Sequence, residues 1–394
     1  MTSSLPLDQI ICGDNLETMR TWPDACIDAI VTDPPYGLSF MGKKWDYDVP
    51  SVEVWAECLR VLKPGGHLLA FAGTRTQHRM CSNIEDAGFE IRDMIAWVYG
   101  SGFPKSLDVG KAIDKAAGAE REVVGQKIRG DVEKAKTSGS TYASADANKN
   151  NKAIFGYGVE NITAPATDAA RQWSGWGTAL KPAMEPITVA RKPLIGTVAE
   201  NVLTHGTGAI NVDGCRVGTE GGTTRSEQAP YSESGWRTGH EVLPLNAGRW
   251  PANLIHDGSD EVVGLFPQTG NSCGRDSRGR VHQAFTDDAQ KSTRDDVHPG
   301  FGDSGSAARF FYTAKADRAE RGRNNNHPTV KPVDLMRYLV RLVTPIGAIV
   351  FDPFSGSGTT CVAAKLEFVK FIGIEREAEY VAISQKRLQQ NLLF

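Results

Sequence analysis

The chain has 394 residues, of which 40% are hydrophobic and 23% charged. These are values of globular proteins, so a fibrous or wholly disordered chain is excluded, and the length allows two or three domains or one large domain with a sizeable insertion. The net charge of −3 excludes a general attraction to polyanions; any such binding needs a local patch, and basic residues outnumber acidic ones over 99–199.

The first hundred residues alternate short apolar runs with stretches of helical spacing. This pattern is typical of strand-helix-strand units and of a largely parallel sheet. Strands are expected in the apolar runs that end at turn residues, and helices where apolar residues recur every three or four positions. We expect strands at 9–12, 27–32, 67–71 and 94–99, and helices at 16–22 and 52–62.

A stiff loop is expected directly after the strand at 27–32, at Asp33-Pro34-Pro35-Tyr36. The two prolines remove two backbone donors and fix φ, so the loop presents only acceptors. It suits an exocyclic amino group, because Asp33 and the Pro34 carbonyl can accept its two hydrogens while Tyr36 stacks on the base. The alternative is a proline turn with a packed tyrosine.

The middle of the chain has a different composition. Residues 130–153 and 271–306 are rich in Gly, Ser, Asp and Asn and poor in large apolar residues, as loops are. Ordered pieces are expected between them, including a strand at 186–190 and the pair Trp173 and Trp176, which we expect in a core rather than as a stacking platform. The simplest organisation is an α/β core split by a long irregular insertion.

The last seventy residues return to the alternating pattern. Strands are expected at 348–351 and 370–374, and helices over the apolar face from Leu335 to Val343, at 359–366 and at 379–392. Each half of the pattern is too small for a convincing sheet, so we expect the two ends of the chain to build one sheet together.

A glycine-rich turn, Asp352 to Thr360, separates the strand at 348–351 from the helix at 359–366. Its glycines let the backbone approach a ligand, and the free N–H groups of the helix start favour a polar or anionic group. Nineteen positions after Gly356, Glu375 ends the next strand, where a carboxylate can accept hydrogen bonds from two ribose hydroxyls. A ribose-containing cofactor is indicated; the alternative is a tight turn with a solvated glutamate.

Three motifs together resemble one family. The loop Asp33 to Tyr36, the segment Phe354 to Thr359 and the segment His327-Pro328-Thr329-Val330-Lys331-Pro332 resemble the amino-methylating (N6-adenine/N4-cytosine) DNA methyltransferases. The amino-target motif precedes the cofactor motif, an order that resembles the β group of that family, and shorter fragments are similar to a bacterial and phage branch.

The resemblance implies a division of the chain. It covers about 1–110 and 327–394, which would form the methyltransferase catalytic core. The insertion, 111–326, would hold the remaining core strand near 186–190 and a target recognition region at about 195–310. The implied fold is a Rossmann-like, seven-stranded, S-adenosylmethionine-dependent methyltransferase sheet, circularly permuted so that its first strands lie at the C-terminus.

The resemblance also implies the roles of the motif residues. Gly356 and Gly358 would pass under the methionine part of S-adenosylmethionine, Phe354 would lie against it, and Glu375 would hold the ribose. Asp14 matches a position that contacts the cofactor's adenine, although a helix N-cap is an equal alternative, and Lys331 would help to close the pocket unless it is a solvated lysine. The implied catalytic residues are Asp33, Pro34, Pro35 and Tyr36, and the implied cofactor-binding residues are Asp14, Asp33, Lys331, Asp352, Phe354, Gly356, Gly358, Thr359 and Glu375.

The implied reaction is methyl transfer to the amino group of a base flipped out of double-stranded DNA. Direct displacement needs no covalent enzyme intermediate, so Cys12 and Cys26 are interpreted as buried apolar residues. Asp at the first position of the loop resembles adenine-N6 enzymes more often than cytosine-N4 enzymes, and a catalytically inactive DNA-binding relative is a further alternative. Membership of a restriction-modification system and a homodimer are expected by analogy only.

DNA recognition is assigned to the insertion and to the loop after Tyr36. Lys43, Lys44 and Trp45 are a candidate clamp beside the flipped base. Arginines in the insertion could contact guanine or phosphate. We select Arg249 as the candidate DNA contact among them. The full set is Arg216, Arg225, Arg237, Arg249, Arg275, Arg278 and Arg280.

The remaining features predict a protein of the cytoplasm. The longest apolar runs are far shorter than the ~18 residues of a membrane helix, and the first ten residues have no basic-then-apolar leader. The seven cysteines contain no CxxC pair, so neither a disulfide framework nor a metal site is expected.

Overall fold

The fold is taken from a computed structural model. It describes residues 5–38, 46–102, 106–129, 158–218, 223–228, 240–245, 248–269, 304–314, 325, 327 and 329–390. The chain divides into two compact units, a larger one of residues 1–101 and 183–394 and a smaller one of residues 102–182. The expected insertion of 111–326 is therefore divided, because only its first part belongs to the smaller unit.

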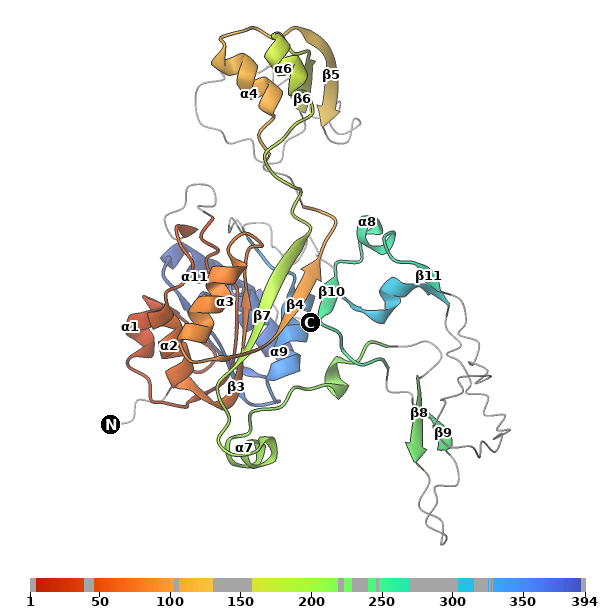
Figure 1. The fold of residues 1–394 in the computed structure, drawn as a ribbon. Coiled ribbons are helices and arrows are strands. Elements are labelled where there is room, and N and C mark those ends of the chain that lie inside the picture. The colour runs from red at the N-terminus through yellow and green to blue at the C-terminus, as the bar shows by residue number, and fades with distance from the viewer. Residues whose placement is uncertain are drawn as a thin grey trace, which may run out of the picture. The chain divides into compact units, whose positions relative to one another are not determined.

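The larger unit is built on a sheet of nine described strands (Figure 1). The strand β7 runs antiparallel to both of its neighbours, and the other pairs are parallel. In spatial order the strands are β1 (Gln9–Cys12), β15 (Lys370–Glu375), β14 (Ile349–Asp352), β2 (Ile27–Thr32), β3 (Leu62–Phe71), β7 (Met184–Arg191), β4 (Glu90–Val98), β10 (Leu254–His256) and β13 (Tyr312–Thr313).

The two ends of the chain do build one sheet. The C-terminal strands β14 and β15 lie between β1 and β2, where a circular permutation would put them; the permutation itself stays a prediction. The count of nine exceeds the expected seven because the short strands β10 and β13 extend the edge beside β4. Each contains at most three residues, too few to give a periodic signal in the sequence.

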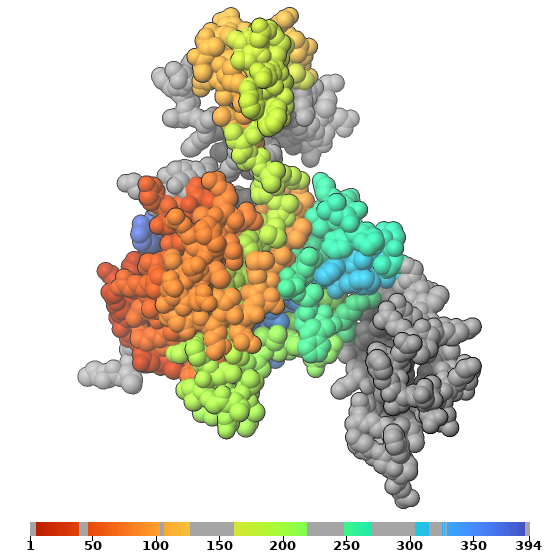
Figure 2. Space-filling model, in the orientation of Figure 1, coloured from red at the N-terminus to blue at the C-terminus, as the bar shows by residue number. Residues whose placement is uncertain are grey.

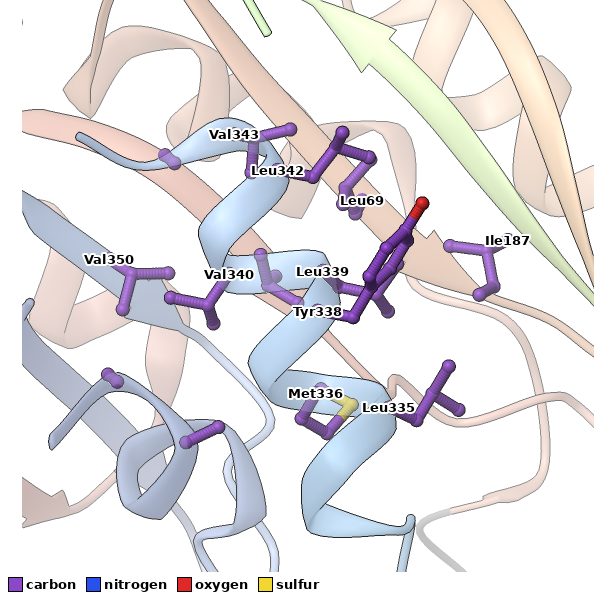
Figure 3. Packing of buried hydrophobic residues seen from close by; sticks show 14 of the residues in the cluster. Leu69, Ile187, Leu335, Met336, Tyr338, Leu339, Val340, Leu342, Val343 and Val350 are labelled. Atoms are coloured by element: carbon purple, nitrogen blue, oxygen red, sulfur yellow. The ribbon is translucent and has the colours of Figure 1, made fainter. Parts of the chain in front are cut away.

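Helices cover both faces of the sheet, which explains why its central strands are apolar at nearly every position. On one face Ile30, Leu68 and Ala70 belong to a core shared with α1 (Asn15–Met19), α2 (Val52–Val61) and α3 (Gln77–Asp86). On the other face Val31, Leu69 and Phe71 share a core with α9 (Val333–Val343), α10 (Thr359–Leu366) and α11 (Ala378–Gln390). Figure 3 shows α9 on this second face, with Leu335 and Leu339 among its buried side chains beside Leu69 and Ile187.

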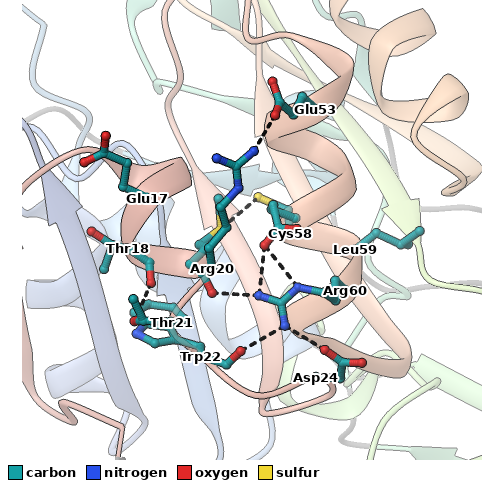
Figure 4. A network of polar contacts seen from close by, with 12 residues as sticks. Glu17, Thr18, Arg20, Thr21, Trp22, Asp24, Glu53, Cys58, Leu59 and Arg60 are labelled. Atoms are coloured by element: carbon teal, nitrogen blue, oxygen red, sulfur yellow. Dashed lines mark hydrogen bonds and ion pairs between the residues drawn. The ribbon is translucent and has the colours of Figure 1, made fainter.

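A polar network fixes α2 against the end of α1 (Figure 4). The Arg60 guanidinium donates to the Met19 and Trp22 carbonyls at 2.7 and 2.9 Å, and to the Glu57 and Asp24 carboxylates. Because these carbonyls lie beyond or at the end of a short helix, the arginine satisfies acceptors that have no helical partner.

Strand β3 begins five residues earlier than expected. The segment Pro64-Gly65-Gly66 falls between the expected helix at 52–62 and the expected strand at 67–71, yet it lies inside β3. A Cβ on Gly66 would lie 2.7 Å from the Leu62 side chain and 2.9 Å from the Asp28 carbonyl oxygen. The glycine therefore allows close packing within the sheet rather than ending the strand.

The edge beside β4 is formed by segments from the middle of the chain. Residues 248–269, which include α8 (Asp260–Val263), pack against 304–314, as Figure 2 shows in teal and light blue. Two short strands, β11 (Gln268–Thr269) and β12 (Gly305–Ser306), pair there. The same unit contains α7 (Val198–His205), two 3-10 turns at Asp213–Cys215 and Ala307–Phe310, and the hairpin β8 (Thr223–Gln228) with β9 (His240–Leu245).

The smaller unit consists of α4 (Val109–Ala116), the antiparallel pair β5 (Val123–Arg129) and β6 (Gly158–Thr163), and α6 (Asp168–Gln172). The fully buried Asp114 holds it together, since it pairs with Arg121 and accepts hydrogen bonds from the Ala166 and Thr167 backbone. These bonds and that of the Thr167 hydroxyl outweigh burial and lower the pKa of Asp114 to about 2.

Two expectations about burial are wrong. Trp173 and Trp176 are 41% and 60% exposed and meet edge to face, because the smaller unit has too few elements to cover both rings. Cys12 is exposed at the end of β1, and Cys26, which precedes β2 and packs against the edge of a core cluster, is only partly buried. No helix among the described residues has the length and apolar character needed to cross a lipid bilayer.

Candidate active site

A cavity of about 460 Å³ opens at one edge of the large sheet. It is lined by the residues that follow β1, β2, β14 and β15. These strands are parallel, so their carboxyl ends lie at the same end of the sheet, and the cavity is found there. The Asp33 to Tyr36 loop, the glycine loop from Asp352 to Thr360 and Glu375 line this cavity, although more than 300 residues separate the first loop from the others. Gly358 is the exception in the glycine loop: it does not line the cavity, and a Cβ there would lie 2.6 Å from Ser384 Cβ.

Asp46 fixes the backbone at the end of the Asp33 to Tyr36 loop. This buried carboxylate accepts hydrogen bonds from the Tyr36 and Gly37 N–H groups at 2.7 and 3.0 Å. The Thr76 hydroxyl donates to the Tyr36 carbonyl at 2.6 Å. Both prolines lack an N–H, so these three contacts fix the loop while its proline face stays free of donors.

Lys331 lies inside the cavity wall and is only 8% exposed, which excludes the alternative of a solvated lysine. Its Nζ lies 2.7 Å from Asp33 Oδ2, 3.0 Å from the Tyr36 hydroxyl and 3.1 Å from Glu185 Oε2. Burial lowers the pKa of Lys331, but the two carboxylates outweigh burial and raise it above the ordinary value, so the side chain is a cation.

Tyr36 belongs to the same network. Its hydroxyl lies 2.7 Å from Asp33 Oδ1 and 2.9 Å from Glu185 Oε2. Burial and the two adjacent carboxylates raise the pKa of Tyr36 well above its ordinary value, so the phenol stays neutral. Its ring lines the cavity, the position that stacking on a base requires; the stacking itself stays a prediction.

The glycine loop depends on its two glycines for its shape. Gly356 and Gly358 have φ values of +51° and +76°, a region that side chains disfavour. A Cβ on Gly356 would lie 2.9 Å from His327 Nε2. The buried Arg387 donates to the Ser357 carbonyl at 2.7 Å and to the Thr359 hydroxyl at 2.9 Å, so the start of α10 is anchored from α11.

The predicted acidic ligands differ in their surroundings. Glu375 Oε2 accepts the Gly356 N–H at 2.8 Å and its Oε1 accepts the Glu377 N–H at 2.8 Å, and burial raises its pKa. Asp352 is buried, accepts the Thr32 hydroxyl at 2.6 Å, and has its pKa raised by burial to about 6.

Asp14 and Phe354 also line the cavity. Asp14 accepts the Leu16 and Glu17 N–H groups, so the N-cap alternative is confirmed while a contact with a cofactor stays a prediction. The Phe354 ring lies 6.2 Å from that of Trp55, on the wall of the glycine loop.

Among the predicted DNA contacts, Arg216 and Arg249 have described side chains, and neither lines the cavity. Lys43, Lys44 and Trp45 lie outside the described residues, as do Arg237, Arg275, Arg278 and Arg280. The Arg249 guanidinium lies 4.3 Å from the centre of the Phe310 ring, and that of Arg216 lies 5.2 Å from the centre of the Trp250 ring. These arginines lie in the edge region beside β4, and for Arg225 only the backbone is described.

Sequence reasoning missed Asp46, Glu185 and His327 as residues of the site. His327 belongs to a motif that was recognised, and its contact with Gly356 could have been suspected from it. Asp46 and Glu185 are single acidic residues in stretches without a motif, so the sequence carried no signal for either.

A family model and several known proteins are similar to this chain. The family model described as DNA methylase matches residues 27–116 and 271–386. The putative methylase YubD of Escherichia coli (strain K12) is 48% identical over 65 residues, which are 16% of this chain and 29% of YubD. The Type II methyltransferase M.HindIII of Haemophilus influenzae is 23% identical over 341 residues, 86% of this chain and 68% of that protein.

Among solved structures, a complex of M1.HpyAVI with SAM aligns over 96% of this chain and 99% of its own, with a TM-score of 0.40 and 17% identity. The alignments with the first curated relatives span less than a third of the length of those relatives.

Proposed function

We propose, on the premise that this chain belongs to the DNA methylase family of N6-adenine and N4-cytosine methyltransferases, that it transfers a methyl group from S-adenosylmethionine to the amino group of a base in duplex DNA. The observation that carries the proposal is the shared cavity: a donor-free loop bearing Asp33 and a glycine loop facing Glu375 line one space. The first arrangement suits an amino group and the second suits a cofactor with a ribose.

The residues that line the cavity fit S-adenosylmethionine. The left-handed Gly356 has no Cβ, and one built there would meet His327, so the backbone itself forms the surface of the cavity. Glu375 accepts backbone hydrogen bonds from Gly356, Glu377 and Arg376, and a carboxylate has about four acceptor sites, so capacity remains for a ribose hydroxyl. S-adenosylmethionine would supply an electrophilic methyl group on a sulfonium sulfur.

The part of the cavity lined by the Asp33 to Tyr36 loop, here called the target half, would activate an amino group that is a weak nucleophile. The lone pair of a base amino group is delocalised into the ring, and the group is inaccessible inside a duplex. Stacking on Tyr36, worth about 1–3 kcal/mol, offsets part of the cost of flipping the base. Asp33 and the Pro34 carbonyl accept the two amino hydrogens, which localises the lone pair on nitrogen and aims it at the methyl carbon.

No covalent nucleophile is required for this reaction, and no cysteine is among the described residues that line the cavity. Displacement would form the N–C bond as the C–S bond breaks, with the thioether S-adenosylhomocysteine as the leaving group, and the methylated nitrogen would release one proton to solvent. Both the target loop and the glycine loop are intact in sequence and line one cavity. An inactive DNA-binding relative is therefore the weaker alternative.

Adenine N6 is the proposed target and cytosine N4 the second candidate. Both bases present an N–C=N edge that the acceptors of the loop can bind, and the preference rests on Asp33 at the first position of the loop. The proposed location is the cytoplasm, and a homodimer and a partner nuclease remain predictions by analogy.

The test is methylation of duplex DNA by the purified protein with S-adenosylmethionine, followed by digestion to nucleosides and mass spectrometry. N6-methyladenine is the expected product. N4-methylcytosine would replace the first candidate by the second, and absence of any methylated nucleoside would overturn the function. Modification-sensitive sequencing of genomic DNA from cells that express the protein would give the recognition sequence.

A further inference from the structure

Glu185 lies in the target half of the cavity, although it belongs to neither motif of the proposed reaction. It is the second residue of β7, the strand that runs antiparallel to its neighbours. The N-terminal end of an antiparallel strand lies where the parallel strands have their carboxyl ends. The fold therefore carries Glu185 to the cavity edge, opposite Trp97 of β4 in the sheet register.

Glu185 is fixed from several directions. Its Oε2 lies 3.1 Å from Lys331 Nζ and 2.9 Å from the Tyr36 hydroxyl, and the Tyr99 hydroxyl also hydrogen-bonds this carboxylate. Its side chain is 20% exposed, against 21% for Asp33 and 8% for Lys331. Lys331 thus lies between two carboxylates and is the more deeply buried of the three groups.

The hydrogens of this network can be counted. Lys331 has three, and its three partners are Asp33 Oδ2, Glu185 Oε2 and the Tyr36 oxygen. The Tyr36 hydroxyl has a single hydrogen, yet two carboxylate oxygens lie within hydrogen-bond distance of it. The hydroxyl can therefore donate to Asp33 or to Glu185, but not to both at once.

This competition bears on the target. Each Asp33 oxygen has two acceptor sites: Oδ2 uses one for Lys331, and Oδ1, the oxygen we expect to accept a hydrogen from an amino group, uses one for the Tyr36 hydroxyl. While the Tyr36 hydroxyl donates to Oδ1, it competes with that amino hydrogen. When the hydroxyl turns to Glu185, both acceptor sites of Oδ1 become available and no donor of the network loses its acceptor.

We infer that Glu185 is a positioning residue of the methyl-transfer site: it is the alternative acceptor for the Tyr36 hydroxyl and the second anchor of Lys331, and so it removes a competing donor from Asp33 Oδ1 when the target amino group binds there. The inference rests on the proposed function and deepens it, since it assigns a role in target presentation to a strand outside both motifs. Glu185 acts through Tyr36 and Lys331 and makes no contact with the methyl group.

The role predicts a specific kinetic signature. Glu185→Ala should lower kcat by about 10-fold to 100-fold, because a misplaced acceptor impairs alignment, and should leave the dissociation constant of S-adenosylmethionine within about twofold. Glu185→Gln keeps an acceptor oxygen for the hydroxyl and should recover part of the loss. The assay is transfer of tritiated methyl groups to duplex DNA, with calorimetry for the cofactor and thermal unfolding as a check of folding.

The discriminating measurement is a double-mutant cycle with Tyr36→Phe, which keeps the ring and removes the hydroxyl. The part of the loss that depends on that hydroxyl disappears in the Tyr36→Phe background, whereas the part that depends on Lys331 remains, so Glu185→Ala should lower kcat at least about threefold less there than in the wild type, because interacting residues are not additive. A merely structural role would give the same loss in both backgrounds, and that result would overturn the inference.

A matched control is Glu90→Gln. Glu90 lies on β4, pairs with Arg191 of β7 at 2.7 Å and does not line the cavity. This variant should keep the wild-type kcat. A wild-type protein that transfers no methyl group to DNA would remove the proposed function and this role together; an active wild type with an equally active Glu185→Ala would remove only the role.

Discussion

Asp33 is the side chain on which the proposed chemistry depends most directly. Its carboxylate lies between the Lys331 ammonium and the Tyr36 hydroxyl, each at 2.7 Å, while Glu375 and the glycine loop form a separate wall of the cavity. Asp33→Ala should therefore lower methyl transfer by at least about 100-fold, the scale of losing a group that binds the transition state. The dissociation constant of S-adenosylmethionine should stay within about threefold.

The measurement pairs tritium incorporation into DNA with calorimetric titration of the cofactor. Asp24→Ala is a suitable control, because its exposed carboxylate pairs with Arg60 away from the cavity. Asp33→Asn covers the case in which Ala at this position unfolds the protein, since it preserves the shape of the side chain. Unchanged turnover in folded Asp33→Ala would contradict the assignment.

Asp352 gives a prediction about pH. Burial raises its pKa from 3.8 to about 6 in the folded protein. Between these two pH values the folded state binds more protons than the unfolded state, so the free energy of unfolding contributed by this group falls as pH rises from about 4 to about 6 and then levels. Asp352→Asn should remove that decline, so its stability relative to wild type should increase across this window.

Urea unfolding at about pH 4, 5, 6 and 7 measures the effect. Asp257→Asn provides a control of opposite sign. Burial raises the pKa of Asp257, but hydrogen bonds from Ser259 and Gly100 outweigh burial and lower it. That aspartate stabilises the fold above its ordinary pKa and loses the contribution in acid, so its replacement should cost most near neutral pH. Equal pH dependence of Asp352→Asn and wild type would refute the prediction.

The glycine loop is the element whose backbone most limits substitution. Gly356 has a φ of +51°, and its missing Cβ would lie 2.9 Å from His327 Nε2. Gly356→Ala should therefore cost about 1–2 kcal/mol in backbone strain and, by displacing His327 or the loop, should weaken S-adenosylmethionine binding by about 10-fold or more.

Gly347→Ala separates the two effects. Gly347 has a φ of +78° and no heavy atom within 4 Å of its would-be Cβ, and it does not line the cavity. It should show the loss in the free energy of unfolding without the loss in cofactor affinity. Calorimetry on both variants decides; equal cofactor affinity of Gly356→Ala and wild type would contradict the role of the loop.

The elements also show what sequence reasoning can reach. Strand β2 was predicted with its correct bounds because five of its six residues are apolar or small and the run ends at a turn. The helix α3 was missed because only Met80 and Ile84 of its ten residues are buried, too few for a clear period. Both loops of the site were found because proline and glycine restrict the backbone locally, whereas Glu185 reaches the cavity only through the antiparallel course of β7, a long-range property.

At the scale of the whole molecule, charge decides how DNA can be bound. The net charge is −3, so attraction to a duplex must come from local groups rather than from the overall field. The affinity for duplex DNA should fall steeply with salt, with a slope of log affinity against log salt of about −0.9 for each phosphate contact. Single-stranded RNA should be retained less, and equal, salt-insensitive retention of both would contradict a duplex substrate.

Replacing Arg249 tests whether the region beside β4, residues 248–269 and 304–314, belongs to the surface that binds DNA. Its guanidinium lies 4.3 Å from the centre of the Phe310 ring, and that of Arg309 lies 4.6 Å from the same centre, so two cations contact one aromatic ring. If Arg249 contacts a phosphate, Arg249→Ala should weaken duplex binding for every sequence and reduce the salt slope by about 1. Arg20→Ala removes an exposed arginine that pairs with Glu53 and should leave the slope unchanged. Fluorescence anisotropy over a salt series measures both slopes, and a wild-type slope in Arg249→Ala would take this arginine out of the DNA interface.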